Sequence, residues 1–100
     1  MRVYISGPIT NDPNYMEHFE NAERQLLDQG YESIVNPATV NKWLPNDFTH
    51  AEYMEVCLAQ LNCCNVIYML NGWEQSKGAM IELGYAKEHG HGIIYESEVG

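Results

Sequence analysis

The stretch VIYML, residues 66–70, is a continuous apolar run with polar residues on both sides. A strand with one face in water alternates apolar and polar side chains, whereas an unbroken apolar run is typical of a strand covered on both faces. Strands of that kind occur in parallel sheets that lie between two layers of helices. The run therefore predicts the central strand of a layered α/β domain.

Strand-like and helix-like segments alternate on either side of this run. Strand character is found at residues 3–5, 31–35 and 92–95, and helical signals at residues 12–29, 49–61 and 76–89. The order β-α-β-α-β-α-β is typical of a sheet whose parallel strands are joined by right-handed crossovers. The sequence thus predicts an α/β fold with a parallel sheet of four to five strands.

Local signals place the ends of the helices. Asp12-Pro13 predicts a cap followed by proline in the first helical turn, and Gly30 closes that helix. The spacing of Thr49 and Glu52 predicts a capping box at the start of the second helix, and Ser76 can cap the third. Residues 38–48 show no clear period, so we expect an irregular excursion with room for a short helix.

The composition limits the classes of partner. One hundred residues suit a single domain over residues 1–100, and 14 acidic against 5 basic residues give a net charge of -9. Such a surface repels nucleic-acid backbones and anionic membranes. The three cysteines are clustered and odd in number, which argues against a disulfide framework and for a reducing compartment. Without a signal peptide or an apolar run of bilayer length, we expect a cytoplasmic location.

Polar, glycine-containing loops follow three of the predicted strands, at residues 6–11, 36–39 and 71–78. Because ligands of open parallel sheets bind beyond the carboxyl ends of the strands, we expect the site there. Gly7 lets a ligand approach the backbone, and Ser6 and Thr10 offer hydroxyl groups. The first loop has neither a dinucleotide fingerprint nor a P-loop, and taken alone it is better explained as an ordinary turn between strand and helix.

Glu82 is the candidate catalytic residue. It lies six residues after Ser76, about one and a half turns into the predicted helix, and helical side chains lean back toward the strand ends. Glycosidic chemistry uses such a carboxylate to capture or stabilise an oxocarbenium-like C1′. The hydroxyl group of Tyr4 is placed to orient Glu82. The alternatives are a solvated helical glutamate and a tyrosine at the edge of the core.

Other chemistry-bearing residues give weaker signals. Trp43 and Trp73 lie in loops near the expected site, where either one stacks on a base or packs under a lid. His89 and His91 are not spaced with the cysteines as metal ligands are, so we expect no metal ion. Cys63 and Cys64 are expected to pack at a helix end.

Several of these residues together resemble the nucleoside 2-deoxyribosyltransferase-like superfamily. The resemblance covers nearly the whole chain and is closest to its small phage and bacterial members, which are related to the 2′-deoxynucleoside 5′-monophosphate N-hydrolases. It rests on YISGP at residues 4–8, NPA at 36–38, CNVIYML at 64–70 and the pattern GW-x-x-S-x-GA-x-x-E at 72–82. The last pattern is specific to the small members, whereas the other pieces are individually common.

The resemblance implies a flavodoxin-like three-layer sandwich, a site without metal or cofactor, and a homodimer or higher homo-oligomer with pockets near the subunit contact. It places the nucleophilic glutamate of the superfamily at Glu82 and its orienting tyrosine at Tyr4. In the N-hydrolases a serine at the position of Ser76 helps to hold the 5′-phosphate, which favours a phosphorylated substrate here. Further substrate contacts are then expected from Ser6, Gly7, Asn36, Trp73 and Gly78.

Four positions depart from the pattern of the superfamily. Pro8 and Thr10 stand where the N-hydrolases have a serine and an arginine that contact the phosphate. Cys57 stands where an aspartate usually supports protonation of the leaving base, and Asn65 stands where close relatives often have an aspartate. A cysteine of ordinary pKa does not readily replace aspartate as a proton relay. Glu55, Glu74 or a residue of a neighbouring subunit are the substitutes that the sequence offers.

Two functions from different classes follow, and a third is structural. The leading one is cleavage or transfer at the N-glycosidic bond of a (deoxy)nucleoside 5′-monophosphate. The alternative is a nucleotide-binding or sequestering protein with impaired catalysis, which Cys57 and Asn65 motivate. An interaction domain in which Glu82 is simply exposed is the third. The first two share a small nucleotide or nucleoside as partner.

Overall fold

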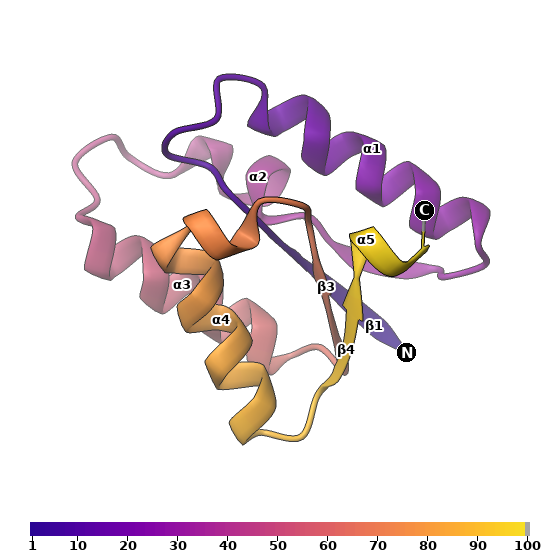
Figure 1. Ribbon diagram of the computed structural model, residues 1–100. Coiled ribbons are helices and arrows are strands. Elements are labelled where there is room, and N and C mark those ends of the chain that lie inside the picture. Colours follow the sequence, from indigo (N-terminus) through magenta and orange to yellow (C-terminus); the bar gives the residue numbers. More distant parts are fainter. Residues whose placement is uncertain (100) are drawn as a thin grey trace.

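The computed structural model describes residues 1–99, which form a parallel sheet between two layers of helices (Figure 1). The strands are β1 (Arg2–Ser6), β2 (Ser33–Val35), β3 (Val66–Met69) and β4 (Gly92–Tyr95). The helices are α1 (Tyr15–Asp28), α2 (Pro37–Val40), α3 (His50–Asn62), α4 (Lys77–Glu88) and α5 (Glu96–Val99), with 3-10 turns at Asn41–Trp43 and Trp73–Gln75. The α/β fold and the four-stranded parallel sheet are thus confirmed.

The strand order is β2-β1-β3-β4, with every neighbouring pair parallel. β3 pairs with β1 on one side and β4 on the other, and all four of its residues are buried. The continuous apolar run therefore forms an interior strand, as predicted. The sheet order reverses between β1 and β3, which is where the crevice of an open parallel sheet is found.

Strand alternation divides the core into two clusters, one on each face of the sheet. Val3 and Ile5 of β1 face α1 and join Phe19, Ala22 and Leu26. On the opposite face lie residues of β1, β3, α3 and α4: Tyr4, Cys57, Leu61, Ile67, Met69, Leu83 and Ala86. The second cluster includes two of the residues on which the functional prediction depends.

The predicted start of the first helix is wrong. α1 begins at Tyr15 with Asn14 at the N-cap, so Pro13 lies before the helix. The Asp12 carboxylate accepts a hydrogen bond from the backbone N–H of Asn14 at 2.9 Å, and its other oxygen pairs with His18 at 2.7 Å. The aspartate therefore stabilises a turn ahead of the helix, because the chain makes consecutive turns between residues 9 and 15.

Two other boundaries differ from the sequence prediction. β2 begins at Ser33, because the N–H of Tyr31 bonds back to the carbonyl of Leu26 in the turn that closes α1 at Gly30, whose φ is 99°. The short helix allowed within residues 38–48 is present as α2 and the following 3-10 turn, although α2 begins at Pro37.

Both predicted caps of the later helices are confirmed. The Thr49 hydroxyl accepts from the N–H of Glu52 at 3.1 Å, and the Glu52 carboxylate accepts from the N–H of Thr49 at 2.8 Å, which completes the capping box of α3. The Ser76 hydroxyl accepts from the N–H of Ala79 at 3.1 Å at the start of α4. In the part of the chain described, no helix has the length and apolar character that a membrane span needs.

Candidate functional site

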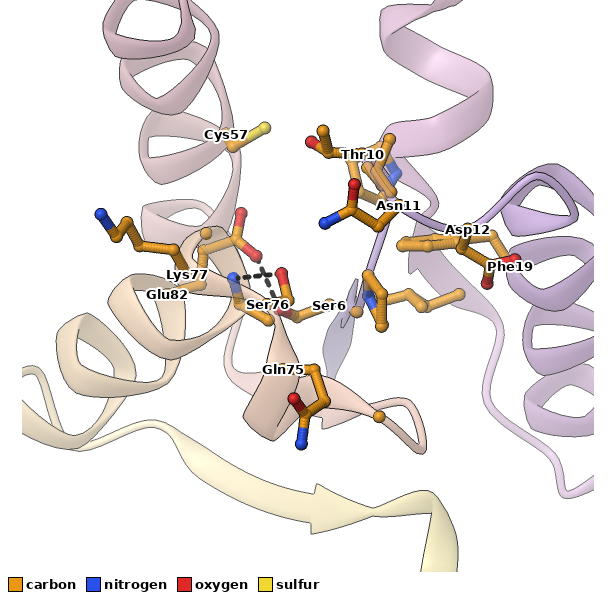
Figure 2. A pocket seen from close by; sticks show the side chains of 18 of the residues that line it. Ser6, Thr10, Asn11, Asp12, Phe19, Cys57, Gln75, Ser76, Lys77 and Glu82 are labelled. Carbon is orange, nitrogen blue, oxygen red and sulfur yellow. Dashed lines mark hydrogen bonds between the residues drawn. The ribbon is translucent and has the colours of Figure 1, made fainter.

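A cavity of about 840 Å³ opens at the carboxyl ends of β1 and β3 (Figure 2). Its walls come from the end of β1 and the loop that follows, the start of α1, the first half of α3, and the loop and first turns that lead into α4. The lining residues with polar or titratable side chains include Tyr4, Ser6, Asp12, His18, His50, Tyr53, Cys57, Gln75, Ser76, Lys77 and Glu82. Residues of the first and third predicted loops line the cavity, and from the second predicted loop Pro37 lines it.

Glu82 lies in this cavity and is held at both carboxylate oxygens. The Tyr4 hydroxyl donates to Oε2 at 2.7 Å, and the Ser6 hydroxyl donates to Oε1 at 2.6 Å. Only 6% of Glu82 is exposed, so the interpretation as a solvated helical glutamate is wrong. The hydrogen bond between Tyr4 and Glu82 is present as expected from the sequence.

The regular geometry of a strand and a helix produces this arrangement. Tyr4 and Ser6 are two residues apart in β1, so both side chains point to the face of the sheet that α4 covers. The cap at Ser76 fixes where α4 begins, and Glu82 follows in the second turn. Its carboxylate leans back toward the strand ends, as helical side chains do.

Two glycines allow the walls of the cavity to approach one another. A Cβ atom on Gly7 would lie 2.8 Å from Cβ of Leu70, so the loop after β1 passes against the end of β3 without room for a side chain. A Cβ atom on Gly78 would lie 3.3 Å from Sδ of Met54, where α4 approaches α3. Both glycines line the cavity, as expected.

Burial dominates the electrostatics of Glu82. Desolvation raises the pKa of its carboxyl group to about 7, against the opposing effect of hydrogen bonds from Ser6, Tyr4 and Cys57. Burial and the neighbouring Glu82 raise the pKa of the Tyr4 hydroxyl well above its ordinary value, so Tyr4 stays a donor. The carboxyl group of Glu82 therefore ionises at a higher pH than that of an exposed glutamate.

Cys57 belongs to the same site. It lines the cavity with 2% of its surface exposed, and the Asn41 amide donates to its Sγ at 3.6 Å. Burial and the charge of Glu82 raise the pKa of the thiol to about 11. The thiol is consequently protonated at neutral pH and is a much weaker acid than an aspartate, which agrees with the expectation that a cysteine does not readily replace aspartate as a proton relay.

Asn65, which stands where an aspartate was expected from the resemblance, lies away from the cavity. It precedes β3, and its side-chain oxygen accepts from the backbone N–H of Arg2 at 2.8 Å. Both residues are at the amino ends of their strands, whereas the cavity opens at the carboxyl ends. An asparagine at this position therefore does not bear on the chemistry of the cavity.

Two predicted substrate contacts, Asn36 and Trp73, do not agree with the geometry, since neither is among the described residues that line the cavity. Asn36 caps α2: its side-chain oxygen accepts from the N–H groups of Ala38 and Thr39, and its amide donates to Glu23 at 3.0 Å. An asparagine directly before a proline is a typical helix start, and this signal was available in the sequence.

The two tryptophans have other surroundings. Trp73 packs against the second core cluster and lies 5.8 Å from the ring of Tyr95, centroid to centroid. Trp43 is 82% exposed, and the ammonium group of Lys42 is 5.1 Å from its ring. The predicted stacking of a base on Trp73 thus has no support in this arrangement.

Several residues that line the cavity were not predicted from the sequence. Asp12 and His18 line the wall next to the first loop and are joined by their 2.7 Å contact, and His50 and Tyr53 line the wall formed by α3. Asp12 and His18 are six residues apart on either side of an irregular turn, so no regular periodicity predicts that they meet. Among residues 1–99, no group of three or more histidine, cysteine, aspartate or glutamate side chains could hold a metal ion.

Comparison with known proteins gives a family and a fold relative. Residues 1–95 match the family described as "Domain of unknown function (DUF4406)". A solved structure described as "2-desoxiribosyltransferase from Leishmania mexicana" superposes with a TM-score of 0.69 at 20% sequence identity. The match covers 94% of this chain and 62% of the other, so the protein spans less than two thirds of that relative. No curated protein matches the sequence.

Proposed function

The chain belongs to the DUF4406 family, and for this member we propose hydrolysis or transfer at the N-glycosidic bond of a (deoxy)nucleoside 5′-monophosphate. One observation carries the proposal: a buried glutamate, held at both oxygens by hydroxyl groups, lies in a cavity at the reversal point of a parallel sheet. A fold like that of a 2-desoxiribosyltransferase supports the same class of chemistry.

Glu82 acts on C1′ of the sugar. Its carboxylate attacks C1′, or stabilises the positive charge that develops there, while the bond to the base nitrogen breaks. Tyr4 and Ser6 fix the orientation of the carboxylate, so that little reorganisation is needed when the sugar binds. Water or a second base then takes the sugar from Glu82.

The 5′-phosphate binds where two backbone segments meet the cavity. The turn at Ser6-Gly7 lines the cavity. The start of α4 lines it too, from the cap residue Ser76 to Gly78. Free N–H groups and the positive end of a helix dipole attract phosphate even in a protein whose net charge is -9. Lys77, in the same turn, also lines the cavity and is the lysine nearest in sequence to this helix start.

The direct test measures release of free base. The purified protein is incubated at pH 7.5 with each of the four deoxynucleoside monophosphates, the matching ribonucleotides and the unphosphorylated nucleosides, and the products are separated chromatographically. We expect base release from at least one monophosphate, and a loss of about 10³-fold or more in Glu82→Gln because the nucleophile is removed. A folded protein that releases base from none of these compounds would contradict the proposal.

Binding without turnover is the second candidate function. The observation in its favour is Cys57, since a thiol with a pKa of about 11 is a poor proton donor for a leaving base. A binder would show saturable thermal stabilisation by a monophosphate with no product, and Glu82→Gln would keep that stabilisation. An enzyme loses turnover in the same variant, so the two functions are separable.

A further inference from the structure

Cleavage of an N-glycosidic bond needs a proton as well as a nucleophile. The electron pair of the breaking bond goes to a nitrogen of the base, and a positioned acid that protonates the base typically contributes 10²–10⁴-fold to the rate. Glu82 is engaged at C1′ in the proposed function and is unavailable for this second task. If the proposed function holds, another residue must supply this proton.

The described residues that line the cavity offer few proton donors. Burial raises the pKa values of Tyr53 and Cys57, to about 11 for the thiol, so both hold their protons too tightly. The Tyr4 hydroxyl already donates to Glu82. Lys77 lies in the first turn of α4, the part of the cavity assigned to the phosphate. The remaining donors are the two histidines, His18 and His50.

His18 is the histidine that a carboxylate holds in place. Its Nδ1 lies 2.7 Å from Oδ2 of Asp12, and an ionised carboxylate only accepts, so Nδ1–H donates. The hydrogen bonds from Asn14 and His18 lower the pKa of Asp12, which keeps the carboxylate charged. Asp12 in turn is fixed by the backbone N–H of Asn14 at 2.9 Å. This contact occupies Nδ1 and leaves the second ring nitrogen, Nε2, for a contact with a ligand.

The position of the pair suits an acid that acts opposite a nucleophile. Asp12 and His18 line the same cavity as Glu82 but come from the turn before α1 and from its first turns, not from α4. Figure 2 shows Asp12 across the hollow from Glu82, with Ser6 between them. Glycosidases likewise place their two catalytic groups on either side of the bond that breaks.

We propose that His18, positioned by Asp12, is the general acid that protonates the leaving base. As Glu82 forms a bond to C1′, the C1′–N bond breaks, its electron pair goes to the base, and the proton on Nε2 of the imidazolium passes to the base, which departs neutral. Water then attacks C1′, Glu82 leaves as the carboxylate, and the proton lost by the water restores the imidazolium. The products are the free base and the sugar 5-phosphate.

A leaving group that needs no proton tests this assignment. The wild-type protein, His18→Gln, Asp12→Asn and His50→Gln are assayed on a deoxynucleoside monophosphate and on p-nitrophenyl 2-deoxyribofuranoside 5-phosphate, whose nitrophenolate leaves as an anion. We expect His18→Gln to lose about 10²-fold or more on the nucleotide and less than about fivefold on the nitrophenyl compound. Asp12→Asn should show the same selective loss to a smaller degree.

His50→Gln is the matched control, because it removes an imidazole from the same cavity and should change both rates by the same factor. Equal losses of His18→Gln on both substrates would overturn the proposal and indicate a role in binding or folding. Unchanged rates of His18→Gln on both substrates would also overturn the proposal, while leaving the proposed function intact. Failure of the wild-type protein on both substrates would instead overturn the proposed function, and this assignment with it.

Discussion

At the scale of single residues, the protein keeps an ionisable group where it costs stability. Glu82 is 6% exposed, and burial raises its pKa to about 7 from an ordinary 4.5. Two hydroxyl donors offset part of the desolvation of the charged form but do not cancel it. Such a compromise is typical of catalytic groups, whose environment is arranged for reaction and not for folding.

The raised pKa of Glu82 predicts a pH-dependent stability. Below pH 4.5 the side chain is protonated in both the folded and unfolded states, and its contribution is fully present. As the pH rises from 4.5 to about 7, the unfolded state ionises Glu82 while the buried group in the folded state still holds its proton. Up to about 3 kcal/mol of the free energy of unfolding is therefore lost, and the loss is complete once the pH has passed about 7. Glu82→Gln should remove this loss. Urea unfolding at pH 5 and pH 8 measures the difference between the two proteins, and parallel profiles would contradict the prediction.

Only some of the contacts made by single residues were predictable from the sequence. The Tyr4–Glu82 contact was predictable, because strand ends and the first turns of the next helix meet at one edge of a parallel sheet. The bond from Ser6 to Glu82 was not expected, although Ser6 shares a strand face with Tyr4. Asn36 was expected to contact a ligand, but its side-chain oxygen instead caps α2.

At the scale of elements, the caps determine where the cavity walls begin. α3 supplies one wall of the cavity, and its first residue follows the capping box of Thr49 and Glu52. α4 begins after Ser76 and brings Glu82 to the strand ends. These helices were predictable from their cap residues, whereas α5 was missed because its four residues give no periodic signal.

Removing the cap of α3 should destabilise the protein measurably. Thr49→Ala eliminates the hydroxyl that accepts from the N–H of Glu52, and the free energy of unfolding should fall by about 1 kcal/mol. Chemical denaturation followed by circular dichroism measures this change. Thr39→Ala, at an exposed threonine of α2, is the matched control and should change stability by less than about 0.5 kcal/mol. Equal effects of the two substitutions would contradict the assigned role of the cap.

At the scale of the whole molecule, several large apolar side chains remain exposed. Large hydrophobic residues with more than a third of their surface exposed include Leu27, Val40, Trp43, Phe48, Met80 and Ile81. Met80 and Ile81 belong to α4 and directly precede Glu82. The sequence predicted the layered fold because pattern, turn residues and element order agree, but a contact between subunits leaves no comparable periodic signal in a single chain.

We therefore keep the prediction of a homodimer or higher homo-oligomer and expect α4 to take part in the contact. Light scattering coupled to size-exclusion chromatography should give at least twice the mass of 11.4 kDa. Ile81→Glu places a charge at a residue that is 43% exposed and should shift the protein toward monomer, because an unpaired charge is costly in a contact. Glu88→Gln, in the last turn of the same helix, controls for a change of charge on α4. A monomeric wild-type protein would contradict this expectation.

The exposed cysteine and the cavity lie at opposite ends of the sheet, which has a practical use. Cys57 and Cys64 are buried, whereas Cys63 is exposed at the end of α3, where its carbonyl accepts from the Arg2 side chain at the amino ends of the strands. The cavity opens at the carboxyl ends. A maleimide-linked biotin or fluorophore should therefore attach at Cys63 without any engineering, and a biotin there would tether the protein to a sensor surface with the cavity directed into solution.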